Sequence, residues 1–375
     1  MTATSECVLI DRPAPLAEMI DALAGVPRFA LDTESSGMHA YYEHVCLVQI
    51  SIPGHDWLID PLAVDIRELA PLLADGACTK VLHAGENDVA VLHREFAMPV
   101  NGMFDTMLAA RVLGWNGVGL GDILAARFGH RTDKRWQRHD WSRRPLGPEA
   151  IDYARHDTHF LLALCDEQVP ELVESGKLDD LLHACDRIGR AKPRPRLFDP
   201  DACWRLDGAR KLDGEGRSVL YGLFALREEL ARAIDRPLFR VIDDATLLTL
   251  ARDRPLRADL VARTRGIGAG PGRRHAAHIA DTIARCSKLP PPARPPSARR
   301  DEPRLARFEA LRGWRRQCAI DRGLEPDIVL GRETMAAIAE QDPHTRAELE
   351  AAAILDAWEL DRYGDPIVAV LAALR

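Results

Sequence analysis

The segment RFALDTE, residues 28–34, is a short apolar stretch that ends in two acids, Asp32 and Glu34. Side chains two positions apart on a strand face the same side, so both carboxylates project into one space while Thr33 points away. Neighbouring carboxylates repel each other, and each is easier to protonate unless a cation lies between them. Acids at a strand end are most often simply solvated, so this pattern alone is weak evidence. It predicts a strand and raises the hypothesis of a cation site.

Other short β-type segments surround this one in the first half of the chain. Helical patterns follow them, and early strands with later helices indicate an α/β domain with a mixed sheet. We place this domain at residues 1–195. The predicted strands are 7–10, 29–32, 45–52, 57–59 and 80–84, and the predicted helices are about 65–74, 87–97, 105–113, 118–128 and 147–167.

Segments rich in proline and arginine divide the rest of the chain. The stretches 191–200 and 288–303 are predicted linkers. Amphipathic helical patterns lie between and after them, which predicts two all-α modules at residues 205–290 and 304–375. A chain of 375 residues is long enough for several domains.

The composition predicts a cytoplasmic protein that does not interact with a membrane. No apolar run approaches membrane-spanning length, and the N-terminus lacks the pattern of a secretory signal. The eight cysteines are scattered without a C-x-x-C pair, which favours reduced thiols over disulfides or a zinc site.

The charge distribution is uneven along the chain. Residues 251–300 hold twelve Lys and Arg against three Asp and Glu, a balance of +9, whereas the whole chain has a net charge of −7. A basic module on an acidic body is typical of nucleic-acid binding. An arginine-rich solvated surface explains the same numbers equally well.

Two further segments offer acids that could join the same site. In VLHAGENDVAVL, residues 81–92, a strand runs into a helix that begins near Asp88, although acids in a first helical turn also simply favour the helix dipole. In EAIDYARHDTHFLLAL, residues 149–164, Tyr153 and Asp157 are four positions apart and share one helix face. A packed tyrosine beside a solvated aspartate is the alternative for that pair.

The combination changes the interpretation, because Mg²⁺ prefers oxygen ligands and two ions about 3.5–4 Å apart need several carboxylates. Acids on a strand, a helix and a second helix, in this order, resemble the DEDD exonuclease superfamily. The spacing of Tyr153 and Asp157 is similar to its DEDDy branch. The other branch has His-x-x-x-x-Asp, and position 152 is aspartate here, so His156 fits poorly as a catalytic histidine.

The chain further resembles ribonuclease D over about residues 6–185. The motifs that carry the resemblance are LDTE, YY with VCLVQIS, HAGENDV, FDT, DW with RPL, and YARHDTHFLL, and the last is also similar to the nuclear exosome's catalytic exonuclease. One departure is Ser35-Ser36-Gly37, where the family often has a bulky residue after the glutamate. Asp105 of FDT is a rival acid, but it is better explained as a helix cap.

This resemblance implies a ribonuclease H-like fold and a 3′-5′ exoribonuclease. Asp32, Glu34, Asp88 and Asp157 would hold two Mg²⁺ or Mn²⁺ ions, and Tyr153 would orient, or help deprotonate, the attacking water. The implied partner is RNA with a free 3′ end, such as a tRNA precursor. The only nucleotide bound would be the monophosphate product.

The helical modules resemble HRDC domains, which follow the catalytic domain in ribonuclease D and also occur in RecQ-type helicases. RTRGIGAGPGRRH, residues 263–275, offers Arg273 and Arg274 as phosphate contacts, with a plain glycine-rich connector equally open. In the exonuclease domain, Lys134 and Arg135 lie in a basic loop that either contacts phosphates or is merely solvated.

Two other functions remain open at this level. A DNA exonuclease of the Werner type shares the catalytic motifs, and the choice of sugar depends on contacts to the 2′-OH that no residue here reveals. A catalytically silent RNA-binding protein is the third reading, which the presence of all four acids and Tyr153 disfavours. The chain contains no G-x-x-x-x-G-K-[ST] loop of a helicase motor.

Overall fold

The computed structural model describes residues 6–191, 197–267, 270–293 and 301–374. The predicted linkers at 191–200 and 288–303 lie partly outside these residues. None of the described helices has the length and apolar character needed to cross a bilayer.

Within the described residues, the first part of the chain forms a six-stranded mixed sheet in the order β1-β4-β3-β2-β5-β6. Strand β3 is antiparallel to both of its neighbours, β4 and β2, whereas β1 is parallel to β4, and β5 and β6 continue parallel to β2. The five predicted strands are present, and β6 was not predicted. The bounds are β1 Glu6–Ile10, β2 Arg28–Ser35, β3 Val45–Ile52, β4 His55–Ile59, β5 Thr79–Leu82 and β6 Met103–Asp105.

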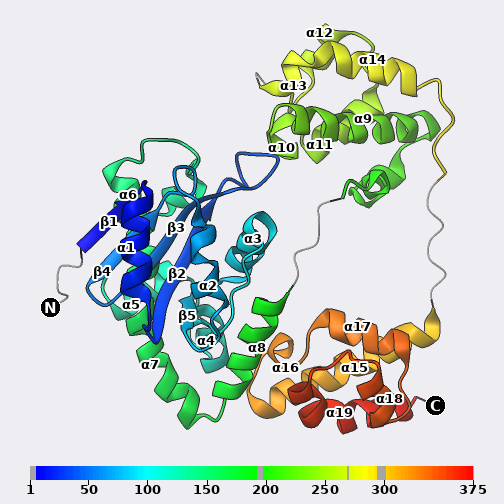
Figure 1. Ribbon diagram of the computed structural model, residues 1–375. Coiled ribbons are helices and arrows are strands. Elements are labelled where there is room, and N and C mark those ends of the chain that lie inside the picture. The colour runs from blue at the N-terminus through cyan, green and yellow to red at the C-terminus, as the bar shows by residue number, and fades with distance from the viewer. Residues whose placement is uncertain (1–5, 192–196, 268–269, 294–300, 375) are drawn as a thin grey trace.

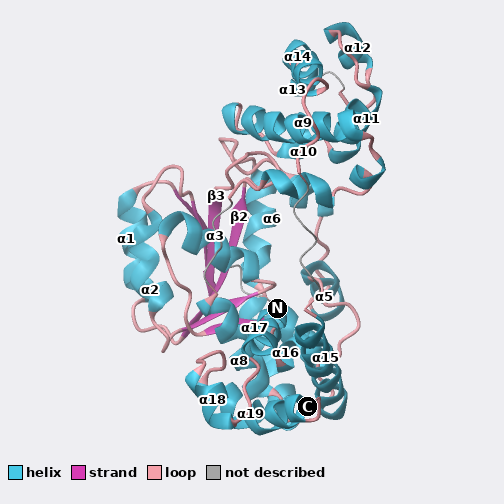
Figure 2. Cartoon of the chain, turned by 90° about the vertical axis from the view of Figure 1, so that its right-hand side faces the viewer, coloured by secondary structure: helices cyan, strands magenta, loops and turns pink. Residues whose placement is uncertain are grey.

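Helices cover both faces of this sheet, with α1 and α2 on one side and α6 on the other (Figure 2). Helix α1 was not predicted, and the helix predicted at 147–167 is divided at Phe160 into α6 and α7. The helices are α1 Pro13–Leu23, α2 Ala70–Ala74, α3 Glu86–Phe96, α4 Thr106–Leu113, α5 Leu120–Arg127, α6 Pro148–His159, α7 Leu161–Glu174 and α8 Leu178–Arg190, with 3-10 turns η1 Ile66–Leu69 and η2 Lys134–Arg138.

The end of strand β2 extends past its parallel neighbour. Pairing with β5 covers Arg28–Ala30, whereas pairing with β3 continues to Ser35. Phe29, Ala30 and Leu31 are fully buried in the core and anchor the strand. The carboxylates that follow therefore lie at the sheet edge where the β5 side of β2 is left open.

The first helical module has a hydrophobic core of its own, and it lies above the sheet domain in Figure 1. Tyr41 of the sheet domain is part of this core and is only 5% exposed. The module contains η3 Pro200–Arg205, η4 Ala209–Lys211, α9 Gly214–Ala233, α10 Leu238–Val241, α11 Asp244–Asp253, α12 Ala258–Arg263, α13 Pro271–Arg274 and α14 Ala276–Cys286.

The second helical module packs against α8 of the sheet domain (Figure 1). Arg322 donates a hydrogen bond to the buried Asp180 of α8, and His183 Nε2 lies 2.9 Å from Asp356 Oδ2. Ile328 joins the core of the sheet domain. The module contains α15 Glu302–Arg322, α16 Pro326–Val329, α17 Arg332–Gln341, α18 Arg346–Ala351 and α19 Ala357–Ala372.

Candidate active site

Strand β2 carries Asp32 and Glu34, both partly buried, on one face of the sheet edge. In the antiparallel register with β3 they lie opposite Gln49 and Leu47. Thr33, between them on the strand, also takes part in the site by bonding to Asp88, contrary to the expectation that it points away.

Asp88 lies in the first turn of α3, as the sequence indicated. Its Oδ1 accepts hydrogen bonds from the backbone N–H of Thr33, at 3.0 Å, and from the Thr33 hydroxyl. The N–H of Thr33 is available because β5 ends before it reaches this part of β2. Asp88 is 6% exposed, so the strand end and the helix start form one buried unit.

Helix α6 brings Tyr153 and Asp157 to the same place from the opposite side. Helix α6 packs on β2, β3 and β4, and Asp157 is 9% exposed. The Tyr153 ring is held between aromatic neighbours, with ring centroids 6.1 Å from Trp141 and 6.3 Å from Trp136. The phenol is therefore fixed by packing one helical turn from the Asp157 carboxylate.

The four carboxylates influence one another strongly. Burial raises the pKa of Asp32 well above its usual range, and the charges of Asp88, Asp157 and Glu34 raise it further. The pKa of Glu34 is also well raised, by burial and then by Asp157 and Asp88. Burial and then Asp88 raise the pKa of Asp157 to about 8. For Asp88 burial raises the pKa to about 6, against the opposing hydrogen bonds from Thr33.

The structure shows no ion pair that would offset this repulsion within its described residues. No described Lys, Arg or His is among the main causes of the pKa shifts of the four acids. Buried acids are ordinarily paired or bound to a metal. Four carboxylates with hard oxygen atoms fit Mg²⁺ or Mn²⁺.

The spacing of the acids bears on how they would share ions. In the described part of the chain, the group of three potential ligands with atoms all within 4.8 Å of one another is His183, Asp356 and Glu359, and no trio of the four acids qualifies. Mg–O distances of about 2.0–2.1 Å place the ligands of one ion within roughly 4 Å of one another.

The group of His183, Asp356 and Glu359 has a structural explanation. Asp356 and Glu359 form the capping box of α19, in which each side chain accepts from the other's backbone N–H. Arg187 lies 3.4 Å from Glu359, and Arg190 lies 3.8 Å from Asp356. Its charges are therefore already balanced, and it joins α8 to the second helical module.

The residues predicted to contact nucleic acid are not gathered at the carboxylates. Lys134 is exposed on η2, whereas Arg135 forms ion pairs with Asp133 and Glu149 at 2.8 and 2.5 Å. Arg135 and Tyr153 line a cavity of 410 Å³ beside α6. Arg273 and Arg274 are exposed on α13 of the first helical module, beside residues 268–269, which lie outside the described part.

Asp105, the rival acid, has the structural role expected of it. Its side chain caps α4 by accepting from the N–H groups of Met107 and Leu108, and it also accepts from Ala84 and Gly85. These bonds account for a fully buried aspartate without a metal.

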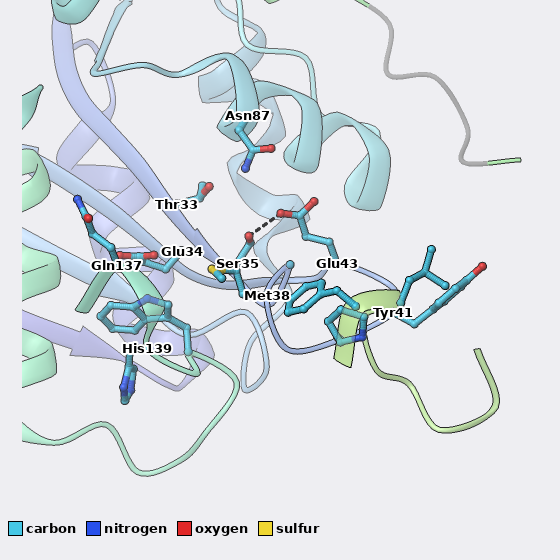
Figure 3. Close-up of a pocket in the computed structure, with 15 residues that line it drawn as sticks. Thr33, Glu34, Ser35, Met38, Tyr41, Glu43, Asn87, Gln137 and His139 are labelled. Atoms are coloured by element: carbon cyan, nitrogen blue, oxygen red, sulfur yellow. Dashed lines mark hydrogen bonds between the residues drawn. The ribbon is translucent and has the colours of Figure 1, made fainter. Parts of the chain in front are cut away.

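A cavity of 570 Å³ opens beside Glu34 and reaches the first helical module (Figure 3). In that view Glu34, Gln137 and His139 lie at one end and Tyr41 at the other. Ser35 donates a hydrogen bond to Glu43 at 2.6 Å, which ties down the polar segment that replaces the family's bulky residue. Gln137, His139 and Phe239 of this lining were missed, because their meeting depends on how distant segments pack.

Comparison with known proteins agrees with this geometry. The description "3′-5′ exonuclease" belongs to the family model that matches residues 7–172, and the HRDC domain model matches residues 216–283 and 304–371. The catalytic part of the chain is a 3′-5′ exonuclease, and helical HRDC domains follow it.

Full-length relatives define the family. The chain is 28% identical to ribonuclease D of Gluconacetobacter diazotrophicus, over 97% of this chain and 92% of that protein. It is 30% identical to ribonuclease D of Acidiphilium cryptum, over 79% and 76%. The chain belongs to the ribonuclease D family, and it is a 3′-5′ exoribonuclease.

The fold comparison confirms the predicted architecture. The crystal structure of Escherichia coli RNase D superposes with a TM-score of 0.64 at 24% identity, covering 96% of this chain and 99% of that one. The ribonuclease H-like mixed sheet and the helical C-terminal part are therefore as predicted from the sequence.

Proposed function

We propose that Asp32, Glu34, Asp88 and Asp157 hold two divalent ions, Mg²⁺ or Mn²⁺, at which terminal nucleotides are hydrolysed from RNA 3′ ends. The observation that carries the proposal is the convergence of four acids from β2, α3 and α6 without a positive side chain among the described residues to balance them. Four carboxylates supply enough oxygen ligands for two ions to share, as two-metal sites require.

When bound, two such ions activate a water and stabilise the charge that develops on the phosphate and the leaving oxygen. The four carboxylates supply the negative field that retains the ions and fixes their separation. Thr33 holds Asp88 through two hydrogen bonds, so this ligand keeps its orientation whether or not an ion is present.

Tyr153 positions the attacking water. Burial, and then the charges of Asp157, Glu34 and Asp32, raise the pKa of its phenol above the ordinary value. The hydroxyl therefore stays protonated at neutral pH and acts as a hydrogen-bond donor or acceptor toward the water. Orientation is favoured over deprotonation by this residue.

The proposed substrates are structured RNAs such as tRNA precursors, and the products are nucleoside 5′-monophosphates. The E. coli relative is described as an exoribonuclease involved in structured RNA processing. The exposed Arg273 and Arg274 support phosphate contacts in the first HRDC domain, and Lys134 and Arg135 support them near α6. We divide the chain into an exonuclease domain at 1–195 and HRDC domains at 205–290 and 304–375, and place it in the cytoplasm, where its eight free cysteines stay reduced.

A tRNA with a 3′ extension tests this proposal. In Mg²⁺ we expect stepwise trimming of the extension, with the double variant Arg273→Ala/Arg274→Ala slower than wild type on this RNA and equal to it on a short unstructured strand. If the double variant and wild type have equal rates on both RNAs, the two arginines do not contact the substrate. Preference for a DNA strand of the same sequence would contradict an RNA substrate.

A further inference from the structure

We propose that Phe239, in helix α10 of the first HRDC domain, stacks on a base near the 3′ end of the RNA whose terminal phosphodiester lies at the carboxylates. The inference rests on the proposed function, and it assigns to the HRDC domain a subsite of the active site itself. Its starting point is the 570 Å³ cavity that Glu34, Asn87 and Phe239 line together.

The cavity exists because the first HRDC domain is anchored to the exonuclease domain. Tyr41 is buried in the HRDC core and donates its hydroxyl proton to Glu228 of α9. Asp235 accepts from the backbone N–H groups of Tyr41 and Tyr42 at 2.9 and 3.3 Å. Arg236 donates to the carbonyl of His39 at 3.1 Å.

These bonds fix the segment that follows Arg236. Pro237, Leu238 and Phe239 come next in the chain and line the same cavity as Glu34. The Tyr41 end of the cavity borders the ribbon of the HRDC domain in Figure 3. An apolar wall is therefore held at a set position relative to the proposed metal ligands.

The chemistry of the lining suits a nucleobase. Phe239 is 51% exposed and Met38 is 42% exposed, so apolar surface faces the opening, while Asn87, Gln137 and His139 offer hydrogen-bonding groups. The volume lies within the range of about 300–1,000 Å³ for small-ligand sites. An apolar face with polar groups at its edges matches a base, which is flat and has hydrogen-bonding edges.

Phe239 also has a neighbour suited to the phosphate backbone. The guanidinium of Arg240 lies 5.5 Å from the centroid of the Phe239 ring. Arg240 is exposed, and among the described residues no ion pair involves it. An aromatic ring beside an unpaired arginine is the combination with which proteins bind single strands without reading their sequence.

The test combines a protein variant with a modified substrate. Phe239→Ala is compared with wild type on an RNA with a single-stranded 3′ end, and on the same RNA with one abasic site at each of the last few positions. We expect Phe239→Ala to raise KM about 5- to 150-fold, as for the loss of one base–aromatic stack, with kcat nearly unchanged. At one position, the abasic site should raise KM for wild type and have no further effect on Phe239→Ala.

Leu256→Ala is the matched control, because Leu256 is 61% exposed on the same domain and does not line the cavity. It should behave as wild type on every substrate. The proposal is overturned if Phe239→Ala matches Leu256→Ala, or if the abasic penalty adds to that of Phe239→Ala at every position. Failure of wild type to shorten the unmodified RNA would instead contradict the proposed function.

Discussion

Asp88 accepts a hydrogen bond from the backbone N–H of Thr33, at 3.0 Å, although 55 positions separate the two residues. The bond joins the start of α3 to the unpaired edge of β2, and the Thr33 hydroxyl adds a second bond to the same oxygen. Asp88, one proposed metal ligand, is thus held by Thr33. Thr33 in turn lies between Asp32 and Glu34, two other proposed ligands. The strand and the helix cannot shift independently without breaking this contact.

Removing the Thr33 hydroxyl should weaken metal binding. Thr33→Val keeps the shape of the side chain but loses one bond to Asp88. Loss of such a supporting contact typically costs about 10–100-fold in metal affinity or activity. We expect the Mg²⁺ concentration for half-maximal activity to rise by that order. Thr33→Ser, which restores the hydroxyl, should return it to the wild-type value, and an unchanged Mg²⁺ dependence in Thr33→Val would show that the bond is dispensable.

Tyr153→Phe should slow the chemical step and leave RNA binding nearly intact. The ring still packs against Trp136 and Trp141, but no hydroxyl remains to orient the water. We expect a lower kcat with KM almost unchanged in single-turnover and steady-state assays. His156→Ala is the comparison, since its ring stacks on His130 and is not expected to act on the water. If Tyr153→Phe is active and His156→Ala is inactive, the role of orienting the water belongs to His156 and not to Tyr153.

The stability of the metal-free protein should depend on pH in a specific way. The folded-state pKa of Asp157 is about 8 and that of Asp88 about 6, both above the unfolded value of about 3.9. The folded state therefore binds more protons, so this contribution to stability is complete below about pH 4 and is lost as pH rises toward 8. Mg²⁺ binds the deprotonated acids and should restore stability most at the higher pH.

Thermal unfolding with EDTA and with Mg²⁺, at pH 5.5 and pH 8, measures this effect. The rise in the midpoint caused by Mg²⁺ should be larger at pH 8, and Asp157→Asn should lose most of that difference. A Mg²⁺ effect of equal size at both pH values in wild type would argue against metal binding by these acids.

The second HRDC domain should depend on the buried Asp180 for its attachment. Asp180 is 1% exposed, bonded to Arg322, and 3.7 Å from Arg362. Arg322→Met leaves the buried charge of Asp180 with Arg362 as its one, more distant, partner. Breaking a buried pair in this way lowers stability by about 3–5 kcal/mol. Hydrogen exchange in α8 and α16 should increase strongly in this variant. Arg316→Met, an exposed change on the same helix, should leave exchange as in wild type, and similar exchange in both variants would mean that other contacts hold the interface.

The sequence indicated most of the sheet because its signals are local. The apolar run of β3 was predicted with the observed bounds, Val45–Ile52, since every residue but the last is buried. Strand β6 has three residues and pairs with β5 alone, so it has too few positions to show a period. Helix α1 begins with prolines and has few charged residues, and its pattern was not distinct enough to predict it.

The candidate site was predictable in its acids and not in its surroundings. Motif spacing identified Asp32, Glu34, Asp88 and Asp157, and the structure brings them together. The role of Thr33 depends on where β5 ends, which pairing between distant segments decides. Phe239 faces the cavity because Tyr41 inserts into the HRDC core, and no pattern around either residue reveals that contact.

The most direct test of the metal-site account uses 5′-labelled RNA with Mg²⁺ and five single variants. Wild type should produce a ladder that shortens stepwise from the 3′ end and disappears with EDTA. Asp32→Asn, Glu34→Gln, Asp88→Asn and Asp157→Asn should each lose nearly all of this activity while remaining folded. Asp152→Asn, at an exposed position on the same helix as Asp157, should give the wild-type ladder. Wild-type turnover in any of the four acid variants, or internal cleavage in place of the ladder, would contradict the account.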